Sequence, residues 1–254
     1  MKFMVSFCSE HGRTKTASDD SALIGHQIIN DDVGVIEFQT PGWICLCDGV
    51  GGNAGGQEAS LFVTEALSKT HVPQSVEEVK ALFIDINNRL LAQAQNTADH
   101  KMMATTATAL FLSDESVYLA HIGNTRLYTK RGAFIQQLTV DQTTYQWLLD
   151  HGNVAAAEAC NRSEITGAMG GGKPDLITSI AVEQLFERKI PSTILLTSDG
   201  IHEYLSQDEI EDILEADESM LSRAKMLCDS ALDKGSDDDR SVIIVCVDCD
   251  QSKS

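Results

Sequence analysis

The residues best suited to chemistry in this sequence are aspartates that stand beside apolar segments. Asp48 in Cys-Asp-Gly-Val-Gly-Gly and Asp199 in Thr-Ser-Asp-Gly each follow an apolar run, and Asp239 precedes one. A fourth acidic position, Asp19-Asp20, lies in a polar N-terminal stretch. Mg²⁺ and Mn²⁺ prefer oxygen ligands, and carboxylates at the rim of a rigid sheet can converge on such ions with little reorganisation. Together these aspartates predict a divalent metal site.

A single Asp-Gly pair is weak evidence, because this dipeptide is usually only a turn. Repetition favours the metal interpretation: an apolar segment followed by Asp-Gly occurs twice, and a later aspartate opens a third apolar segment. The net charge of -19, from 38 acidic and 19 basic residues, adds a second argument. Such an acidic chain repels phosphate unless positive charge is concentrated locally, and metal ions are the obvious source of that charge.

Composition limits the class of protein. The 254 residues, 43% of them hydrophobic, are enough for a single domain spanning 1–254. The acidic balance gives no support for a nucleic-acid surface or a basic membrane patch, and no stretch of about 18 apolar residues predicts a membrane span. The seven cysteines are odd in number and scattered, which fits reduced thiols in a cytoplasmic protein better than a disulfide framework.

Strand-like and helical segments come in groups rather than in regular alternation. Expected strands lie at 2–7, 33–38, 43–47, 105–112, 116–122, 125–129, 134–138, 176–182, 193–197 and 242–247, and expected helices at 57–68, 75–95, 207–215 and 219–234. Strands grouped in hairpins, with pairs of helices between the groups, argue against a doubly wound parallel sheet. The pattern predicts an α+β sandwich.

Short motifs, taken in chain order, resemble those of the metal-dependent Ser/Thr protein phosphatases of type 2C, particularly the compact bacterial members. The motifs are Asp19-Asp20, Asp48-Gly-Val-Gly-Gly52, Ala104-Thr-Thr106, Gly123-Asn-Thr-Arg126, Leu138-Thr-Val-Asp141, Ile165-Thr-Gly-Ala-Met-Gly170, Ser198-Asp-Gly200 and Asp239-Arg-Ser241. Their shared order over most of the chain is specific where any one motif would be weak. The resemblance implies an α+β fold with two antiparallel sheets packed as a central sandwich and flanked by pairs of helices, in four α-β-β-α layers.

The resemblance also implies a cofactor and its ligands. Two divalent cations, Mn²⁺ or Mg²⁺, would be held by Asp48 as the bridging residue, the Gly49 carbonyl, Asp199, Asp239, and, directly or through water, Asp20 and Asp19. Two such ions polarise the phosphoryl oxygens and lower the pKa of a bridging water, which then attacks phosphorus directly. The expected reaction is hydrolysis of phosphoserine or phosphothreonine, with Asp48, Asp199 and Asp239 as the catalytic residues.

The cation that would hold substrate phosphate departs from the family pattern. The family usually places an arginine five residues before the second aspartate of the N-terminal pair, and Lys15 occupies that position here. A lysine supplies charge but not the planar, bidentate fork of an arginine. Arg13 could take over this role, and the alternative that both are ordinary surface cations stays open.

Three further departures concern metal-binding and catalytic positions. Asn124 stands where many bacterial members carry an aspartate that helps to bind a third metal, and a neutral amide is a poorer ligand. Val50 stands where eukaryotic members carry a histidine proposed as general acid. Arg240 replaces the asparagine that commonly follows the last metal aspartate, and the run 237–239 leaves the register uncertain by one residue. Asp239 is favoured because it leaves the expected spacing to the strand that begins at residue 242.

Two other functions compete with a phosphatase. Residues 49–54 fit a loose dinucleotide-binding Gly-x-Gly-x-x-Ala pattern, but Asp48 would repel an unmetallated pyrophosphate, and no acidic strand end follows about 20 residues later. A phosphatase fold kept as a regulatory or phosphoprotein-binding module would explain Lys15, Asn124 and Arg240. The retained aspartates argue against it. Cys246-Val-Asp-Cys249 indicates a strand end rather than a zinc or redox site.

The segment 145–172 is expected to form the flap that varies most among related phosphatases and shapes access to the site. It has a helical pattern but nothing that identifies a substrate. A phosphorylated protein that is the target of a Ser/Thr kinase is the partner expected from family analogy alone. The protein is expected to act as a monomer.

Overall fold

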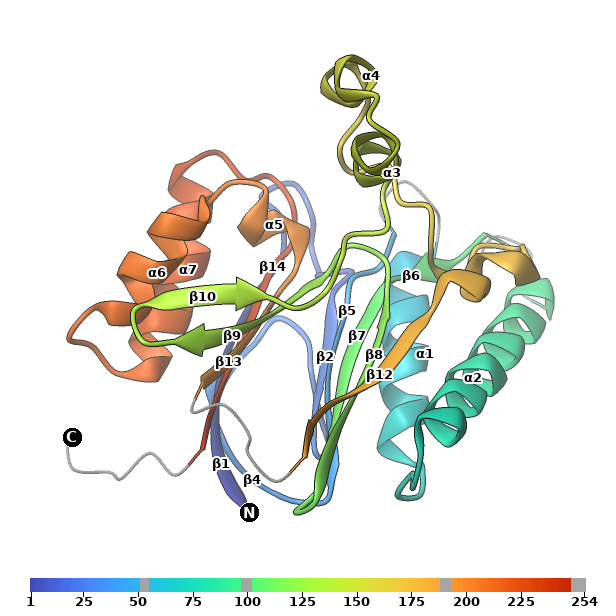
Figure 1. The fold of residues 1–254 in the computed structure, drawn as a ribbon, viewed down its shortest axis with the longest axis horizontal. Coiled ribbons are helices and arrows are strands. Elements are labelled where there is room, and N and C mark those ends of the chain that lie inside the picture. Colours follow the sequence, from blue (N-terminus) through green and yellow to red (C-terminus); the bar gives the residue numbers. More distant parts are fainter. Residues whose placement is uncertain (51–54, 97–101, 188–192, 248–254) are drawn as a thin grey trace.

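Two six-stranded antiparallel sheets lie face to face at the centre of the protein (Figure 1). The structure is a computed structural model and describes residues 1–50, 55–96, 102–187 and 193–247. The first sheet contains, in spatial order, β10 (Phe134–Gln137), β9 (Arg126–Arg131), β13 (Thr193–Thr197), β14 (Arg240–Val247), β1 (Lys2–Glu10) and β4 (Val33–Gln39). The second contains β12 (Ala181–Glu187), β8 (Ser116–Ile122), β7 (Ala107–Leu112), β5 (Gly42–Cys47), β2 (Ser21–Ile24) and β3 (Gln27–Ile29).

Apolar side chains on the facing sides of the two sheets form the central core. In β1, Phe3, Val5 and Phe7 alternate with residues that face the other way, as the two-residue period of a strand requires. They share this core with Ile44 and Leu46 of β5 in the opposite sheet. The outer faces of both sheets are apolar as well, so each must be covered by another layer.

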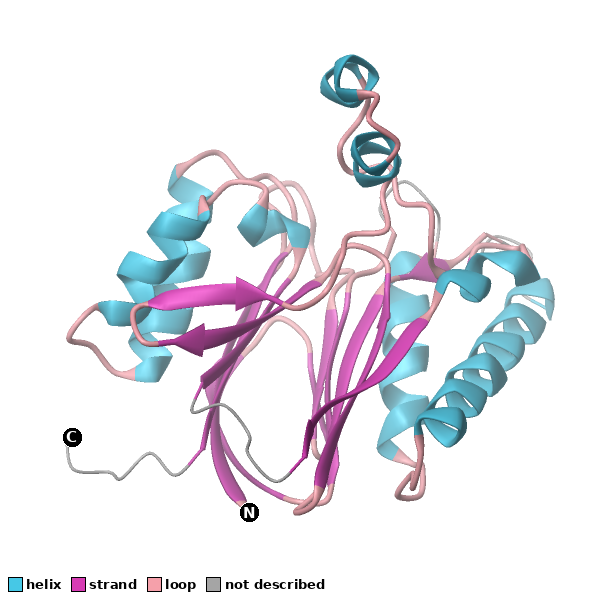
Figure 2. Cartoon of the chain, in the orientation of Figure 1, coloured by secondary structure: helices cyan, strands magenta, loops and turns pink. Residues whose placement is uncertain are grey.

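Helices supply these outer layers (Figures 1 and 2). The second sheet is covered by α1 (Gly56–Ser68) and α2 (Val76–Asn96), and the first by α6 (Gln207–Glu215), α7 (Met220–Asp233) and the short α5 (Asp199–His202). Helix α6 begins with a full capping box, in which Ser206 and Glu209 each bond the other's backbone N–H. The arrangement confirms the predicted α+β sandwich with four α-β-β-α layers.

Two short helices lie beyond the sandwich, above its rim (Figure 1). They are α3 (Thr144–Asp150) and α4 (Val154–Ala159). The segment that leaves the sandwich for α3 lies beside the segment that comes back from α4. The Thr144 N–H donates to the Glu164 carbonyl at 2.8 Å, and the Thr166 N–H donates to the Gln142 carbonyl at 2.7 Å. The two helices are therefore tethered at their base by backbone hydrogen bonds.

The structure differs from the sequence-based expectation at short elements. Strands β2 and β3 were not expected, because they have only four and three residues and β2 is buried throughout, so neither shows an alternating pattern. The strand expected at 176–182 begins only at Ala181, because Pro174–Ser179 forms a 3-10 helix, η1. A two-stranded ladder of β6 (Ala104–Thr105) and β11 (Met169–Gly170) interrupts the expected strand at 105–112.

Candidate metal centre

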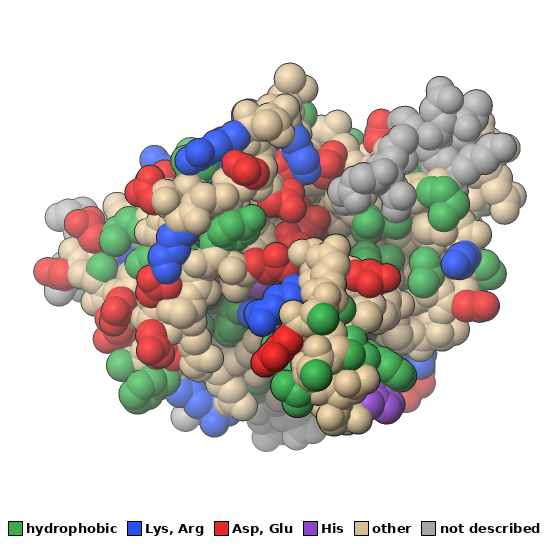
Figure 3. All heavy atoms as spheres, turned by 90° about the horizontal axis from the view of Figure 1, so that it is seen from above, with side chains coloured by type: hydrophobic (Ala, Val, Ile, Leu, Met, Phe, Trp, Pro, Cys, Tyr) green, Lys and Arg blue, Asp and Glu red, His purple; other side chains and the backbone are tan. Residues whose placement is uncertain are grey.

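The aspartates singled out in the sequence lie at one rim of the sandwich, where strands from both sheets begin or end. Asp48 directly follows β5, Asp199 directly follows β13, and Asp239 directly precedes β14. Asp19 and Asp20 directly precede β2. Seen from above this rim, acidic side chains gather in the middle of the face (Figure 3). The sandwich thus brings together carboxylates that are up to 220 residues apart in sequence, as Asp19 and Asp239 are.

The glycines that follow two of these aspartates are required by close backbone contacts. A Cβ atom on Gly49 would stand 2.4 Å from the Gly56 carbonyl oxygen, and one on Gly200 would stand 2.0 Å from the Asp239 carbonyl oxygen. Both distances are far below van der Waals contact, so no other residue fits. The two Asp-Gly pairs therefore do more than make turns. They allow α1 and the segment before β14 to approach the aspartates closely.

Three of the carboxylates have too little positive charge around them. Burial raises the pKa of Asp20 and of Asp48 well above the ordinary value, and neighbouring carboxylates raise both further. Burial and the charge of Asp238 raise the pKa of Asp199 to about 6. In addition, Oδ2 of Asp20 is buried without a hydrogen-bond partner. Buried acidic groups in this state suit an oxygen-ligated divalent cation, which would supply the missing charge.

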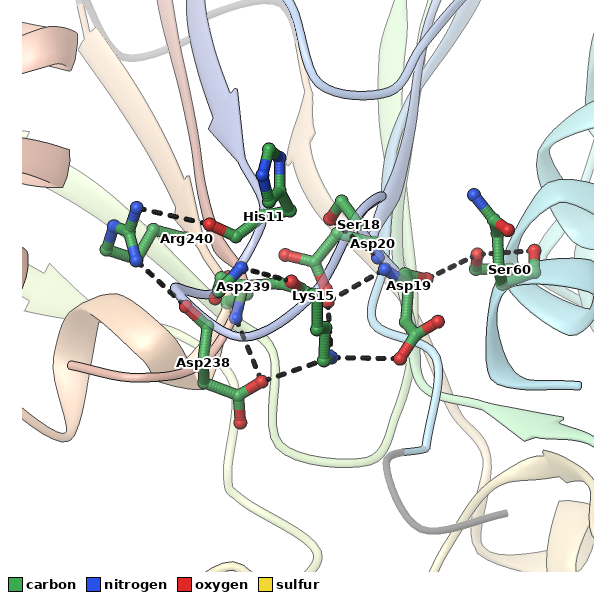
Figure 4. Close-up of polar contacts among 12 residues, drawn as sticks. His11, Lys15, Ser18, Asp19, Asp20, Ser60, Asp238, Asp239 and Arg240 are labelled. Carbon is green, nitrogen blue, oxygen red and sulfur yellow. Dashed lines mark hydrogen bonds and ion pairs between the residues drawn. The ribbon is translucent and has the colours of Figure 1, made fainter. Parts of the chain in front are cut away.

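Asp239, by contrast, has several hydrogen-bond donors around it (Figure 4). Its Oδ1 accepts the Gly12 N–H at 2.8 Å, and its Oδ2 accepts the Asp19 N–H and the Lys15 ammonium, both at 2.7 Å. The side chain is only 3% exposed. The charge that acts on Asp48 and Asp199 belongs to the preceding residue, Asp238. Asp238 thus acts on Asp48 and Asp199, whereas Asp239 contacts Lys15 and, of the three carboxylates, raises the pKa of Asp20.

Lys15 lies among the acidic groups. Its ammonium is 2.9 Å from Asp19 and 3.5 Å from Asp238, in addition to its contact with Asp239. Burial alone would lower the pKa of Lys15, but hydrogen bonds and charge from Asp19 and Asp239 outweigh burial and raise it above the ordinary value. Arg13 points elsewhere, since its Nη2 donates to the Leu232 carbonyl near the end of α7 at 3.1 Å. Of the two basic residues proposed for phosphate, only Lys15 is seen in contact with the aspartates.

Two polar residues hold these aspartates in position. Asn124 donates from Nδ2 to Oδ2 of Asp199 at 3.0 Å and is 3% exposed. Arg240 donates from Nη1 to the Asp238 carbonyl at 3.0 Å and also pairs with Glu10 at 3.2 Å. The positions of Asn124 and Arg240 were identified in the sequence as departures from the family, but their contacts were not foreseen.

Arg126 and Asp141, which belong to two of the motifs but have no predicted role, form an ion pair. Two nitrogens of Arg126 bond the carboxylate of Asp141, at 3.0 Å from Nε and 2.6 Å from Nη2. The hydrogen bonds to Asp141 raise the pKa of Arg126 despite its burial. His121 and His202 are buried and hydrogen-bonded to Thr108 and Thr197, respectively.

Within the described ranges, no three acidic, histidine or cysteine side chains already stand in the geometry of an ion site. No helix in these ranges is long and apolar enough to cross a membrane. Residues 51–54 of the glycine-rich motif, and Cys249, lie outside the described residues. The two residues before this gap are held by backbone hydrogen bonds. The Gly49 N–H donates to the Asp19 carbonyl at 3.1 Å, and the Val50 N–H donates to the Ala104 carbonyl at 2.9 Å.

Comparison with known proteins connects this site to a family. The serine/threonine phosphatase stp of Listeria welshimeri is 25% identical over 251 residues, which cover 94% of this chain and 94% of that protein. The crystal structure of the Mycobacterium tuberculosis serine/threonine phosphatase PstP/Ppp matches with a TM-score of 0.79 at 26% identity, over 97% of this chain and 99% of that one. The catalytic domain of PstP in complex with 2 manganese ions matches with a TM-score of 0.75 at 24% identity, again over 97% and 99%.

The family model described as protein phosphatase 2C matches residues 21–234, which is most of the chain. The match runs from β2 to α7 and includes the whole second sheet, the helices on each side, and the first sheet apart from β1 and β14. The chain belongs to the protein phosphatase 2C family.

Proposed function

We propose that this chain is a metal-dependent phosphatase that hydrolyses phosphoserine and phosphothreonine on other proteins. The observation that carries this proposal is the cluster of carboxylates at the rim, the buried Asp20 and the partly exposed Asp48 and Asp199, whose pKa values are raised by desolvation and by one another's negative charge. Membership of the protein phosphatase 2C family and the relatives named serine/threonine phosphatases support the reaction and the substrate class.

Two divalent cations, Mn²⁺ or Mg²⁺, are the cofactors. When bound, they supply a water of lowered pKa for direct attack on phosphorus and neutralise charge on the phosphoryl oxygens. Asp48, the Gly49 carbonyl, Asp199 and Asp238 would hold these ions. Asp20 would assist them, because its buried Oδ2 has no hydrogen-bond partner. The carboxylates must turn toward the ions, because no group in the described ranges is already arranged around one.

Asp239 and Asp19 take a different role in this proposal. Asp239 already accepts three hydrogen bonds, so an ion bound through its Oδ2 would compete with the Lys15 ammonium. Its function is to fix the loop before β2 and to hold Lys15, which Asp19 contacts from the other side. Lys15 is then the basic residue nearest to the cluster and offers a permanent cation to the substrate phosphate. Arg13, bonded to the end of α7, does not take part.

The remaining expectations rest on analogy and composition. We propose that the substrate is a target of a Ser/Thr kinase and that the protein acts as a monomer in the cytoplasm. We further propose that the chain is a single phosphatase domain and that residues 145–172, which include α3 and α4, form its flap.

The test is hydrolysis of a phosphothreonine peptide by the purified protein with Mn²⁺, with Mg²⁺ and with EDTA. We expect turnover only with metal, and its loss in Asp48→Ala and Asp199→Ala. Asp212→Ala on the exposed side of α6 is the matched control and should retain wild-type turnover. Wild-type protein that is inactive with either metal on several phosphopeptides, but binds them, would replace this proposal with a phosphoprotein-binding module.

A further inference from the structure

A cavity of about 330 Å³ opens beside the metal centre, on the side of the loop that follows Asp48. Its wall is mainly apolar and is made by Val50, Ala104, Ile165, Ala168 and Leu176, with Met102 also lining it. Met102 is 49% exposed, so it stands at the mouth. Glu164 and Lys173 add one negative and one positive charge to the lining. The cavity is large enough for a side chain of the size of leucine or methionine.

The wall of the cavity is close in sequence to the proposed metal ligands. Val50 follows Gly49, and the Val50 N–H bonds the carbonyl of Ala104, another wall residue, at 2.9 Å. Gly49 itself pairs with Thr105 as a β-bridge. The inner wall therefore begins one residue from the proposed metal ligands. Because neighbouring residues of an extended peptide are spaced by about 3.3 Å, a residue beside the phosphorylated one can reach this cavity.

Hydrogen bonds hold the cavity open on both sides. On one side, β6 pairs with β11, and the Gly171 N–H donates to the Met103 carbonyl at 2.9 Å. On the other, the segment containing Ile165 is bonded to the outgoing chain through Thr143 and Thr166. Binding sites of this size are usually preformed, apolar and few in number, and this one has those properties.

We propose that this cavity receives an apolar side chain of the protein substrate, from a residue next to the phosphoserine or phosphothreonine. The inference rests on the proposed phosphatase function and adds a sequence preference to it. A charged side chain fits this cavity less well, because most of its wall is apolar and would remove the charge from water. An acidic side chain is disfavoured further by the net charge of the protein, which is -19.

The test uses phosphothreonine peptides that differ only in the residues on either side of the phosphothreonine, with Leu, Ala or Asp at one flank at a time. We expect kcat/KM for the Leu peptide at one of the two flanks to exceed that for Ala roughly tenfold, and the Asp peptide to be the poorest. Hydrolysis of p-nitrophenyl phosphate, which has no flanking residue, reports the metal centre alone. A wild-type protein that does not hydrolyse it with Mn²⁺ would overturn the proposed function and this inference with it.

Two variants locate the preference. Ala168→Leu fills the cavity, and Met102→Ser makes its exposed mouth polar without changing the core; each should reduce the Leu-to-Ala ratio to about threefold or less, with p-nitrophenyl phosphate hydrolysis unchanged. Ala155→Leu on the exposed face of α4 is the matched control and should keep the ratio. Equal kcat/KM for all flanks in an active wild type would overturn the inference, as would a Leu preference that survives in both variants.

Discussion

Two groups of aspartates share one rim of the sandwich and differ in what surrounds them. In Asp20, Asp48 and Asp199, burial and neighbouring negative charge raise the pKa. Asp239 is as buried as Asp20 and more buried than Asp48 and Asp199, yet it accepts two backbone N–H groups and the Lys15 ammonium. The first group needs positive charge from outside the chain, whereas Asp239 is neutralised by the chain itself.

The difference shows that an aspartate's position at the rim does not decide its role. Asp238 and Asp239 are adjacent, but only Asp238 acts electrostatically on Asp48 and Asp199. We propose that Asp20, Asp48, Asp199 and Asp238 serve the ions and that Asp239 serves the fold. Four predictions test this division, beginning with the largest effect.

The first prediction concerns Asp48. Asp48→Asn should lower kcat/KM on a phosphopeptide by about 10²- to 10³-fold or more, the range found when one group that stabilises the transition state is removed. The same change should raise the Tm of the metal-free protein, because a neutral amide removes a buried group repelled by Asp199 and Asp20. Melting curves in EDTA test the second expectation. A variant that is less stable without metal, and still active, would contradict the grouping of Asp48 with the metal site.

The second prediction separates Asp238 from Asp239. Asp239→Ala leaves the Gly12 and Asp19 N–H groups unpaired and Lys15 without its shortest contact, so the free energy of unfolding should fall by about 2–4 kcal/mol. Asp238→Ala, at an exposed side chain, should change it by less than about 1 kcal/mol. Urea unfolding in EDTA measures both.

Titration with Mn²⁺ completes this comparison. Asp238→Ala should weaken Mn²⁺ binding, measured by calorimetry, by at least about tenfold. The opposite pattern, with Asp239→Ala folded normally and deficient in Mn²⁺, would restore the register that the sequence favoured. Lys15→Met serves as the control for loss of the ion pair without loss of a carboxylate.

Much of the fold could be predicted because its signals are local. Strands β8 and β13 and helix α6 have the bounds expected from periodicity and capping. Residue patterns failed where elements are short or buried on all sides, as in β2, and where Pro174 starts a 3-10 helix inside an apolar stretch. Such elements are fixed by tertiary contacts rather than by their own sequence.

The site could be predicted only in part. Motif order identified the rim aspartates, but three consecutive aspartates share one local pattern, and the choice among them depends on where β14 begins. It begins at Arg240, two residues before the expected start, and pairs Arg240 with Glu10. Adjacent residues on extended backbone point in opposite directions, so the register decides which aspartate faces the cluster. No local signal carries that information.

The third prediction concerns pH. The pKa of Asp199 is raised to about 6 in the folded protein, above the ordinary value of 3.8. The folded state therefore holds a proton that the unfolded state has released, and the free energy of unfolding without metal should fall as pH rises from about 4 to 6. Asp199→Asn should flatten this slope. Urea unfolding in EDTA at pH 4.5, 5.5 and 7.5 measures it.

Stabilisation of the protein by bound metal should have the opposite dependence on pH. Ion binding requires deprotonated carboxylates, so the increase in Tm caused by Mn²⁺ should be larger at pH 7.5 than at pH 5.5. An equal increase at both pH values would mean that Asp199 does not bind the ion. The Asp239→Ala variant should retain the pH dependence, because its carboxylate is not among those repelling Asp199.

The smallest expected effect is at Asn124, the only neutral side chain seen to donate to the carboxylate of Asp199 among the described residues. Asn124→Ala should cost about 1 kcal/mol of stability and reduce kcat/KM severalfold, the usual size for one lost hydrogen bond. Asn124→Asp, of nearly equal size, replaces the donor with a like charge and should destabilise the metal-free protein more than Asn124→Ala does. Melting curves in EDTA, with and without added Mn²⁺, compare the two variants. If Mn²⁺ does not abolish the extra loss in Asn124→Asp, the carboxylates near Asp199 are not neutralised by cations, and the contrast with Asp239 fails.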